Sequence, residues 1–260
     1  MIDFDKIYNE DCLVGMERIP DNSVDCVICD LPYGTTDCAW DSLIPIDKLW
    51  EQYKRVLKPQ GSVLLFGSEP FSTMLRMSNL NWYKYDWIWH KNKTTGFQHA
   101  KNMPLKDYEI ISVFSPASMG HANLLGERRM KYNPQGVRRV NKINHDRGSK
   151  FGTIVGHRPS HKESFLTEYD NYPRMILDFD SAVNGFHPTQ KPVSLVRYLV
   201  LTYTNKDDVV LDNCMGSGTT AIACLEEHRH YIGFELNKEY FDMSQKRIND
   251  YSQQNKLFEL

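Results

Sequence analysis

The sequence lacks any apolar run that could cross a membrane as a helix, which takes about 18 or more consecutive apolar residues. Its first residues, from Met1 to Lys6, are acidic and lack the apolar core of a secretory signal peptide. Internal repeats and tracts of a single residue type are also absent. The 260 residues, 41% hydrophobic and 25% charged, suffice for one large α/β domain or a domain with a substantial insertion. We therefore expect a cytoplasmic, globular protein.

The sequence also lacks a convincing metal-binding pattern. Cys26 and Cys29 form a CxxC pair, but no second pair of ligands follows at the spacing of a zinc finger. On a strand, residues three apart point to opposite faces, so these two thiols would not face one ion. His157 and His161 would share a helix face, but Pro159 argues against a helix there. We expect no metal site, and we interpret the six cysteines as buried free thiols.

Net charge is small, at −2, but the charges are unevenly placed along the chain. The segment from His121 to Lys162 contains ten lysines and arginines and two acids, so it carries +8 and the remaining chain −10. A separation of this size indicates a basic segment that faces a polyanion, on an otherwise acidic body. The alternative is a solvated, flexible loop that happens to be basic.

Apolar runs alternate with helical patterns, which favours an α/β fold with a parallel or mostly parallel sheet. The expected strands are Lys6–Asn9, Ser23–Asp30, Ser62–Gly67, Tyr83–His90, Tyr108–Ser115, Val209–Asp212 and Tyr231–Glu235, and the expected helices are Pro45–Leu57, Pro192–Thr202 and Ser217–Glu227. From Ala117 to Phe186 the periodicity is weak, and this stretch is too long for an ordinary connection. We therefore expect residues 117–186 to be an inserted module or a mobile functional loop.

A glycine turn follows the apolar run that ends at Asp212. Gly216 and Gly218 allow the backbone to approach a ligand closely, and the next helix would present unpaired N–H groups to it. Glu235 ends the following strand, where an acid can accept hydrogen bonds from ribose hydroxyls. The pattern indicates a cofactor that contains a nucleoside, against the alternative of a purely structural turn.

Asp30-Leu31-Pro32-Tyr33 follows another apolar run, at the edge where open α/β sheets place their ligands. The Asp30 carboxylate and the carbonyl before Pro32 could each accept one N–H of an exocyclic base amine, which would free its lone pair. Tyr33 would offer a flat face for the base. The alternative is a strand followed by a type I turn and a packed tyrosine.

The two motifs together resemble those of amino-group DNA methyltransferases that use S-adenosylmethionine. Asp30-Leu31-Pro32-Tyr33 matches that family's Asp-Pro-Pro-Tyr at three of four positions, and Leu31 keeps the main-chain carbonyl that the family uses. The stretch from Asp212 to Thr219 matches Asp-x-Phe-x-Gly-Ser-Gly-Thr except at Cys214. Further stretches similar to the family are Asn9–Leu13, His187–Pro192, and Trp87–Lys91 followed by Gly96, Phe97 and Pro104. The motif order is that of the β class.

This resemblance implies a Rossmann-like, seven-stranded methyltransferase sheet with a circularly permuted motif order. Residues 1–116 would be its catalytic part, residues 117–186 a basic target-recognition insertion, and residues 187–260 its cofactor-binding part. The implied reaction is methyl transfer from S-adenosylmethionine to the exocyclic N6 of adenine in double-stranded DNA, after base flipping. Adenine is favoured because Asp at the first motif position accompanies adenine more often than cytosine in that family.

The resemblance also implies the residues of each site. The catalytic residues would be Asp30, Leu31, Pro32 and Tyr33. The cofactor would contact Asp11, Cys12, Asp30, Lys191, Asp212, Cys214, Met215, Gly216, Ser217, Gly218, Thr219, Thr220, Glu235 and Asn237. The residues expected to bind DNA, as Arg and Lys grip phosphates, are Arg128, Arg129, Lys131, Arg138, Arg139, Lys142, Arg147 and Lys150.

Several alternatives stay open on the sequence. The amine could be cytosine N4, the nucleic acid could be RNA, or the chain could be a DNA-binding protein that has lost its activity. A nicotinamide-dependent dehydrogenase would explain the glycine turn but leaves Asp30-Leu31-Pro32-Tyr33 and the basic segment without roles. A homodimer and a cognate restriction endonuclease are open as partners, and we expect a bacterial or phage-encoded protein associated with the nucleoid.

Overall fold

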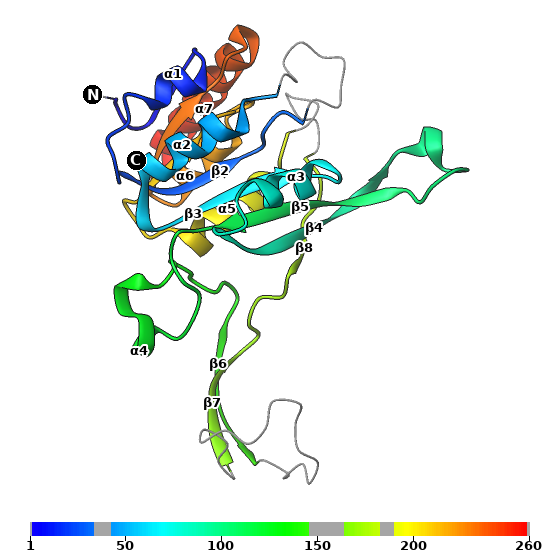
Figure 1. The fold of residues 1–260 in the computed structure, drawn as a ribbon, viewed down its shortest axis with the longest axis vertical. Helices are drawn as coiled ribbons and strands as arrows, with labels where there is room; N and C mark the ends of the chain where they lie inside the picture. The colour runs from blue at the N-terminus through cyan, green and yellow to red at the C-terminus, as the bar shows by residue number, and fades with distance from the viewer. Residues whose placement is uncertain (1, 34–42, 146–163, 183–189, 259–260) are drawn as a thin grey trace. The chain divides into compact units, whose positions relative to one another are not determined.

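A mixed eight-stranded sheet forms the centre of the main unit in the computed structural model (Figure 1). The structure describes residues 2–33, 43–145, 164–182 and 190–258. In spatial order, the strands are β1 (Lys6–Tyr8), β10 (His230–Phe234), β9 (Val209–Asp212), β2 (Val24–Cys29), β3 (Leu57–Gly67), β5 (Lys106–Phe114), β4 (Tyr83–Thr95) and β8 (Ile176–Asp178). β5 runs antiparallel to both neighbours, and the other neighbouring pairs are parallel. The carboxyl ends of all these strands except β5 therefore meet at one edge.

The expected elements are confirmed, although β3 begins at Leu57 rather than Ser62 and β4 ends at Thr95 rather than His90. All seven expected strands form, and β8 adds an eighth at the edge of the sheet. The described helices are α1 (Cys12–Met16), α2 (Ile46–Val56), α3 (Phe71–Ser78), α4 (Ala122–Leu125), α5 (Val193–Tyr203), α6 (Thr219–Glu226) and α7 (Lys238–Phe258). Of these, α2, α5 and α6 correspond to the three expected helices. Within the described ranges, no helix has both the length and the apolar character that a membrane span requires.

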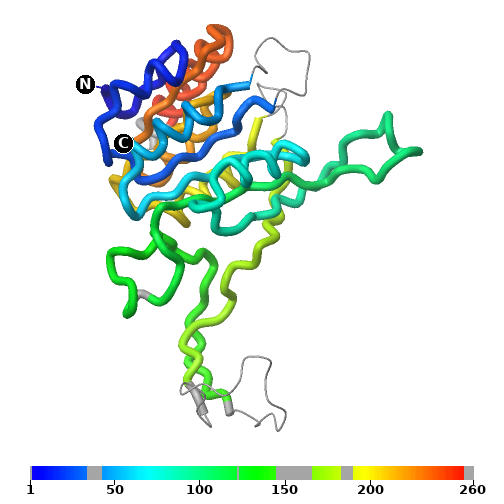
Figure 2. Tube along the Cα trace, in the orientation of Figure 1, coloured from blue at the N-terminus to red at the C-terminus, as the bar shows by residue number. Residues whose placement is uncertain are grey.

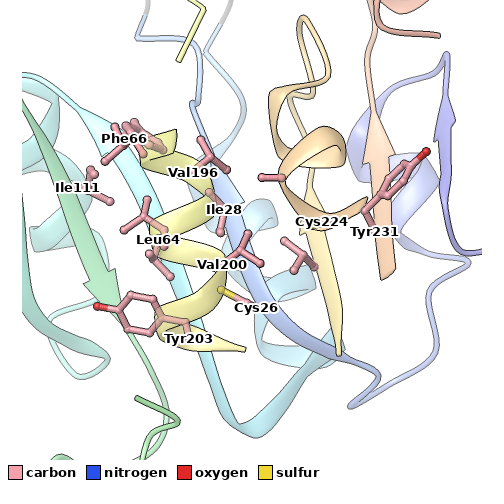
Figure 3. Packing of buried hydrophobic residues seen from close by; sticks show 14 of the residues in the cluster. Cys26, Ile28, Leu64, Phe66, Ile111, Val196, Val200, Tyr203, Cys224 and Tyr231 are labelled. Atoms are coloured by element: carbon pink, nitrogen blue, oxygen red, sulfur yellow. The ribbon is translucent and has the colours of Figure 1, made fainter. Parts of the chain in front are cut away.

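Side chains alternate along β2 and so contribute to two hydrophobic cores, one on each face of the sheet. All six residues of β2 are buried. Cys26 and Ile28 pack in one cluster with Val196 and Val200 of α5 (Figure 3). Cys29 belongs to the second cluster, which includes buried side chains of α2. The expectation that Cys26 and Cys29 point to opposite faces is therefore confirmed, and the described cysteines are free thiols.

Residues 134–174 form a second compact unit. Its strands, β6 (Arg138–His145) and β7 (Ser164–Asp170), pair in antiparallel fashion. The main unit consists of the chain up to Asn133 and again from Met175 onward (Figure 2). The main unit therefore includes residues 117–133 and 175–182 at the two ends of the weakly periodic stretch, and Met130 is buried in its core.

Candidate active site

The glycine turn between β9 and α6 is held by hydrogen bonds that two acidic side chains accept. Gly216 and Gly218 have φ values of +51° and +77°, a region that glycine adopts without steric cost. Glu235 Oε2 accepts a hydrogen bond from the Gly216 N–H at 2.8 Å. Asp212 Oδ2 accepts one from the Thr220 hydroxyl at 2.6 Å, and its Oδ1 accepts one from the Cys214 N–H at 3.1 Å. These hydrogen bonds hold the backbone of the turn in its conformation.

Burial has the largest effect on the pKa of both acids. Burial raises the pKa of Asp212 to about 7, although the hydrogen bonds from Thr220 and Cys214 act in the opposite direction. Burial likewise raises the pKa of Glu235, against the hydrogen bonds from the Asn237 and Gly216 N–H groups. Each carboxyl oxygen has room for more than one donor, so Glu235 can still accept hydrogen bonds from a ligand.

The N-terminal Asn9-x-Asp11 stretch meets the same turn because β1 pairs with β10. Tyr8 lies opposite Phe234 in that ladder. The Asn9 side-chain amide donates to the Glu235 carbonyl at 2.8 Å, which joins residues 226 positions apart in the sequence. Asp11 caps α1 by accepting from the Leu13 N–H at 2.8 Å. Sheet pairing thus places the first motif of the chain beside the last one.

A cavity of about 540 Å³ opens between these elements at the carboxyl edge of the sheet. Its volume lies in the range of about 300–1,000 Å³ that is usual for small-molecule sites. Every expected catalytic and cofactor residue except Gly218 lines it. These lining residues are Asp11, Cys12, Asp30, Leu31, Pro32, Tyr33, Lys191, Asp212, Cys214, Met215, Gly216, Ser217, Thr219, Thr220, Glu235 and Asn237. Gly218 instead lies at the N-terminus of α6, where a Cβ would come within 3.2 Å of Ser244.

The Asp30 loop begins where β2 ends and brings its carboxylate to the cavity. The Tyr33 hydroxyl donates to Asp30 Oδ1 at 2.6 Å, and the Tyr33 ring centroid lies 4.9 Å from that of Phe71. Burial raises the pKa of Tyr33 well above its usual range, so its hydroxyl stays a donor. Leu31 is 4% exposed and packs in the second hydrophobic cluster. Leucine at this position therefore anchors the loop by burial.

Asp30 is also the end of a chain of alternating buried charges. Lys191 contacts Asp30 Oδ2 and lies 3.4 Å from Glu109 Oε2, and Lys91 contacts Glu109 Oε1. Burial alone would lower the pKa of Lys191, but the carboxylates of Asp30 and Glu109 outweigh it and raise that pKa. Lys191 therefore remains a cation that holds the Asp30 carboxylate in place.

Sequence reasoning missed Glu109 and Lys91. Glu109 lies at the second position of an expected apolar strand, Tyr108–Ser115. A charged residue inside such a strand could have indicated that Glu109 belongs to the site. In the structure, Glu109 lines the cavity, and the side chains of Glu109 and Lys91 are 16% and 15% exposed.

The residues expected to bind DNA differ in their surroundings. Arg128, Arg139 and Lys142 are exposed, and Arg129 is half-buried. Arg138 is exposed but lies 3.3 Å from Asp170. Arg147 and Lys150 lie outside the described residues.

Lys131 differs from these residues, because ion pairs hold its ammonium group within the main unit. Its ammonium group lies 3.0 Å from Asp25 and also contacts Asp208, and its side chain is 16% exposed. Asp25 in turn pairs with Lys58 at 2.7 Å and accepts from the Val209 N–H at 3.0 Å. The sequence offers no indication of these ion pairs, because Lys131 lies among other basic residues.

The model of the DNA methylase family, which covers N6 and N4 methyltransferases, matches residues 24–246. The chain belongs to this family. It is therefore a DNA methyltransferase that uses S-adenosylmethionine, as the resemblance of its motifs implied.

Named relatives and solved structures are similar over nearly the whole chain. The type II methyltransferase M.HpaI of Haemophilus parainfluenzae is 28% identical over 94% of this chain and 74% of its own length. The DNA adenine methyltransferase YhdJ of Escherichia coli K12 is 28% identical over 94% of this chain and 82% of its own. The complex of M1.HpyAVI with S-adenosylmethionine has a TM-score of 0.61 at 23% identity, covering 93% of this chain and 98% of its own. The cytosine-N4-specific PvuII DNA methyltransferase has a TM-score of 0.65 at 17% identity, covering 95% and 90%. The expected methyltransferase fold is confirmed.

The described residues around the cavity fit S-adenosylmethionine. Six acidic side chains and one lysine line it: Glu10, Asp11, Asp30, Glu109, Asp212, Glu235 and Lys191. A predominance of carboxylates suits a cationic sulfonium and a nucleoside with ribose hydroxyls. Glu235 and Asp11 could hold the nucleoside end, and the turn from Asp212 to Thr219 the remainder.

Proposed function

We propose that this methyltransferase modifies the exocyclic N6 of adenine in double-stranded DNA, after flipping the base into the cavity. The observation that carries the proposal is the position of Asp30. Its carboxylate lies at the carboxyl edge of the sheet, lines the same cavity as the glycine turn, and is held by Lys191 and Tyr33. The adenine specificity named for the relative YhdJ supports the choice of base.

Asp30 would act on the target amine through acceptor sites that remain on its oxygens. A carboxylate offers about four lone-pair positions, and the described contacts are one from Tyr33 and one from Lys191. One amine N–H would donate to Asp30 and the other to the Leu31 carbonyl, which draws the nitrogen lone pair out of conjugation with the ring. Bound S-adenosylmethionine supplies a methyl group that its sulfonium already activates.

Lys191 would keep the Asp30 carboxylate oriented toward the cavity while the amine attacks. After methyl transfer, the amine proton leaves the nitrogen, and Asp30 is placed to accept it. The rate then derives from positioning and from fixed charges rather than from a new covalent bond to the protein. Flipping is required because the amine cannot be reached inside the base stack.

We further infer that the unit formed by residues 134–174 reads the target sequence. Its exposed Arg139 and Lys142 can reach phosphates or base edges. A homodimer and a cognate restriction endonuclease stay predictions; the names of the type II methyltransferases M.HpaI and M.HinfI among the relatives support an endonuclease partner. A DNA substrate suits the bacterial or phage setting, cytoplasmic and close to the nucleoid, that the sequence led us to expect.

The test is transfer of labelled methyl from S-adenosylmethionine to genomic DNA and, in parallel, to total RNA, followed by mass spectrometry of the nucleosides. We expect N6-methyladenine in DNA. N4-methylcytosine would overturn the base while keeping the reaction, as would suit a fold shared with a cytosine-N4-specific enzyme. Labelled RNA with unlabelled DNA would overturn the substrate.

A further inference from the structure

Strands β4 and β5 continue beyond the sheet as a two-stranded arm, which we define as residues 91–106. Their ladder runs on past the pair His90 and Tyr108 to Thr95 and Lys106. β8 ends opposite His90, and β3 ends opposite Ile110, so no described strand flanks the arm on either side. Figure 1 shows the arm projecting from the end of the sheet.

The arm starts at the wall of the catalytic cavity. β2, β3 and β4 share one direction, because β5 is antiparallel to both β3 and β4. The carboxyl end of β4, where the arm begins, therefore lies at the same edge as Asp30. The contact between Lys91 at the base of the arm and the cavity residue Glu109 makes this connection direct.

The arm is basic in a part of the chain that is otherwise acidic. Its sixteen residues contain four lysines and one histidine but no aspartate or glutamate. Lys91 and Lys106, at its base, contact Glu109 and Ser68. Lys93 and Lys101, further out, are exposed and form no ion pair within the described part of the chain. The uncompensated charge therefore lies on the outer part of the arm.

The tip of the arm also exposes apolar side chains. Phe97 is 67% exposed and Met103 is 59% exposed, beside the polar Gln98 and Asn102. Lysines that can neutralise phosphates, next to an exposed ring that can stack on or wedge against bases, are the combination that nucleic acid binds. An acidic or apolar protein partner would not use all of these groups.

We propose that the arm of residues 91–106 is a DNA-contact element of its own, which grips the duplex backbone beside the flipped base through Lys93 and Lys101. This rests on the proposed function, in which double-stranded DNA is the substrate. The resulting division is simple: the arm holds the backbone next to the cavity, while the cavity receives the base.

The test compares the double variant Lys93→Ala/Lys101→Ala with the control Lys54→Ala/Lys206→Ala. The control lysines are also exposed, but they lie near the amino ends of β3 and β9, at the opposite edge of the sheet. Binding to a fluorescein-labelled duplex of mixed sequence is followed by anisotropy over a series of salt concentrations. Each lost phosphate contact lowers the slope of log K against log salt by about 0.9, so we expect a loss of about 1.8 for the arm variant.

The outcomes separate the arm from the proposed function. A wild-type slope in the arm variant, equal to that of the control, would overturn the arm proposal even if the wild-type protein methylates DNA. A reduced slope would support the proposal that the arm contacts DNA, whatever the wild-type protein methylates. If the wild-type protein transferred no methyl group to DNA, only the proposed function would be overturned. Cofactor binding, measured by calorimetry, should match wild type in both variants. A changed oligomeric state by light scattering with an unchanged slope would assign the arm to a protein interface instead.

Discussion

Replacing Glu109 with glutamine should destabilise the protein and slow methyl transfer, because two buried lysines share this carboxylate. The side chains of Lys91, Glu109 and Lys191 are 15%, 16% and 10% exposed. Glutamine keeps the shape but removes the charge, so both ammonium groups lose a counterion in a poorly solvated place. Breaking a buried ion pair costs about 3–5 kcal/mol, and Lys191 keeps Asp30 as a partner, so we expect a loss of about 3 kcal/mol.

The pH dependence of this loss follows from the pKa of Glu109. Burial raises that pKa, but the charges of Lys191 and Lys91 outweigh burial and lower it below the ordinary 4.5. The ionised carboxylate therefore stabilises the fold above pH 4.5, and this contribution is lost as the pH falls through the lowered pKa. The difference in unfolding free energy between wild type and Glu109→Gln should be largest at neutral pH and shrink in acid.

Urea unfolding over a pH series and single-turnover methyl transfer would measure the two effects. We expect the transfer rate to fall by about 10- to 100-fold, because a shifted Lys191 misplaces Asp30 by a fraction of an ångström or more. Glu51→Gln is the control: Glu51 is 65% exposed and pairs with Lys48 on the surface, so its loss should cost less than about 1 kcal/mol. Equal unfolding free energies for the two variants at neutral pH would refute the reasoning.

Three further predictions use the same assays. Asp30→Asn should abolish methyl transfer while calorimetry finds S-adenosylmethionine bound as in wild type; turnover at the wild-type rate would remove Asp30 from the mechanism. Lys131→Met should lower the free energy of unfolding and leave the salt dependence of DNA binding unchanged. Arg139→Ala should instead weaken the salt dependence of DNA binding and leave the free energy of unfolding unchanged. The reverse pattern would contradict a structural role for Lys131 and a DNA contact for Arg139. Burial raises the pKa of Asp212 from 3.8 to about 7, so its contribution to the free energy of unfolding should fall as the pH rises through 7. The free energy of unfolding that Asp212→Asn loses relative to wild type should therefore be smaller at pH 8 than at pH 5. A loss that did not change with pH would contradict the burial of an ionisable Asp212.

The parts of the fold that the sequence predicted are those with strong local patterns. The apolar residues of α2 recur at helical spacing, and the run that forms β2 is short and ends at a turn signal, as a buried strand does. β8 has three residues, of which only Leu177 is buried, so its pairing with β4 has no local pattern. The 21 residues of α7 are mostly polar and carry few apolar side chains at helical spacing.

The candidate site divides in the same way. Motif spacing brought Asp30 and the glycine turn to one edge because parallel strands end together. The pairing of Lys191 with Asp30 and Glu109 could not be predicted, since it joins side chains 161 and 82 positions apart in the sequence. Lys131 is similar: its basic neighbours in the sequence do not indicate that Asp25 and Asp208 hold this lysine in the main unit.

The charge distribution predicts that salt affects DNA binding and cofactor binding very differently. The cavity is lined by six acids and one lysine, so it should repel phosphates but suit a cationic sulfonium and the neutral flipped base of the proposed reaction. In the functions that we propose, exposed cations such as Lys93 and Arg139 would instead contact the phosphates and release counterions when DNA binds. Over one salt series, the Kd for DNA should rise steeply, whereas the Kd for S-adenosylmethionine should change little, because charges inside a cavity are screened weakly. A cofactor affinity that weakened as steeply as DNA binding would place the cofactor outside the acidic cavity and overturn the assignment of Asp30 and Glu235 to one site.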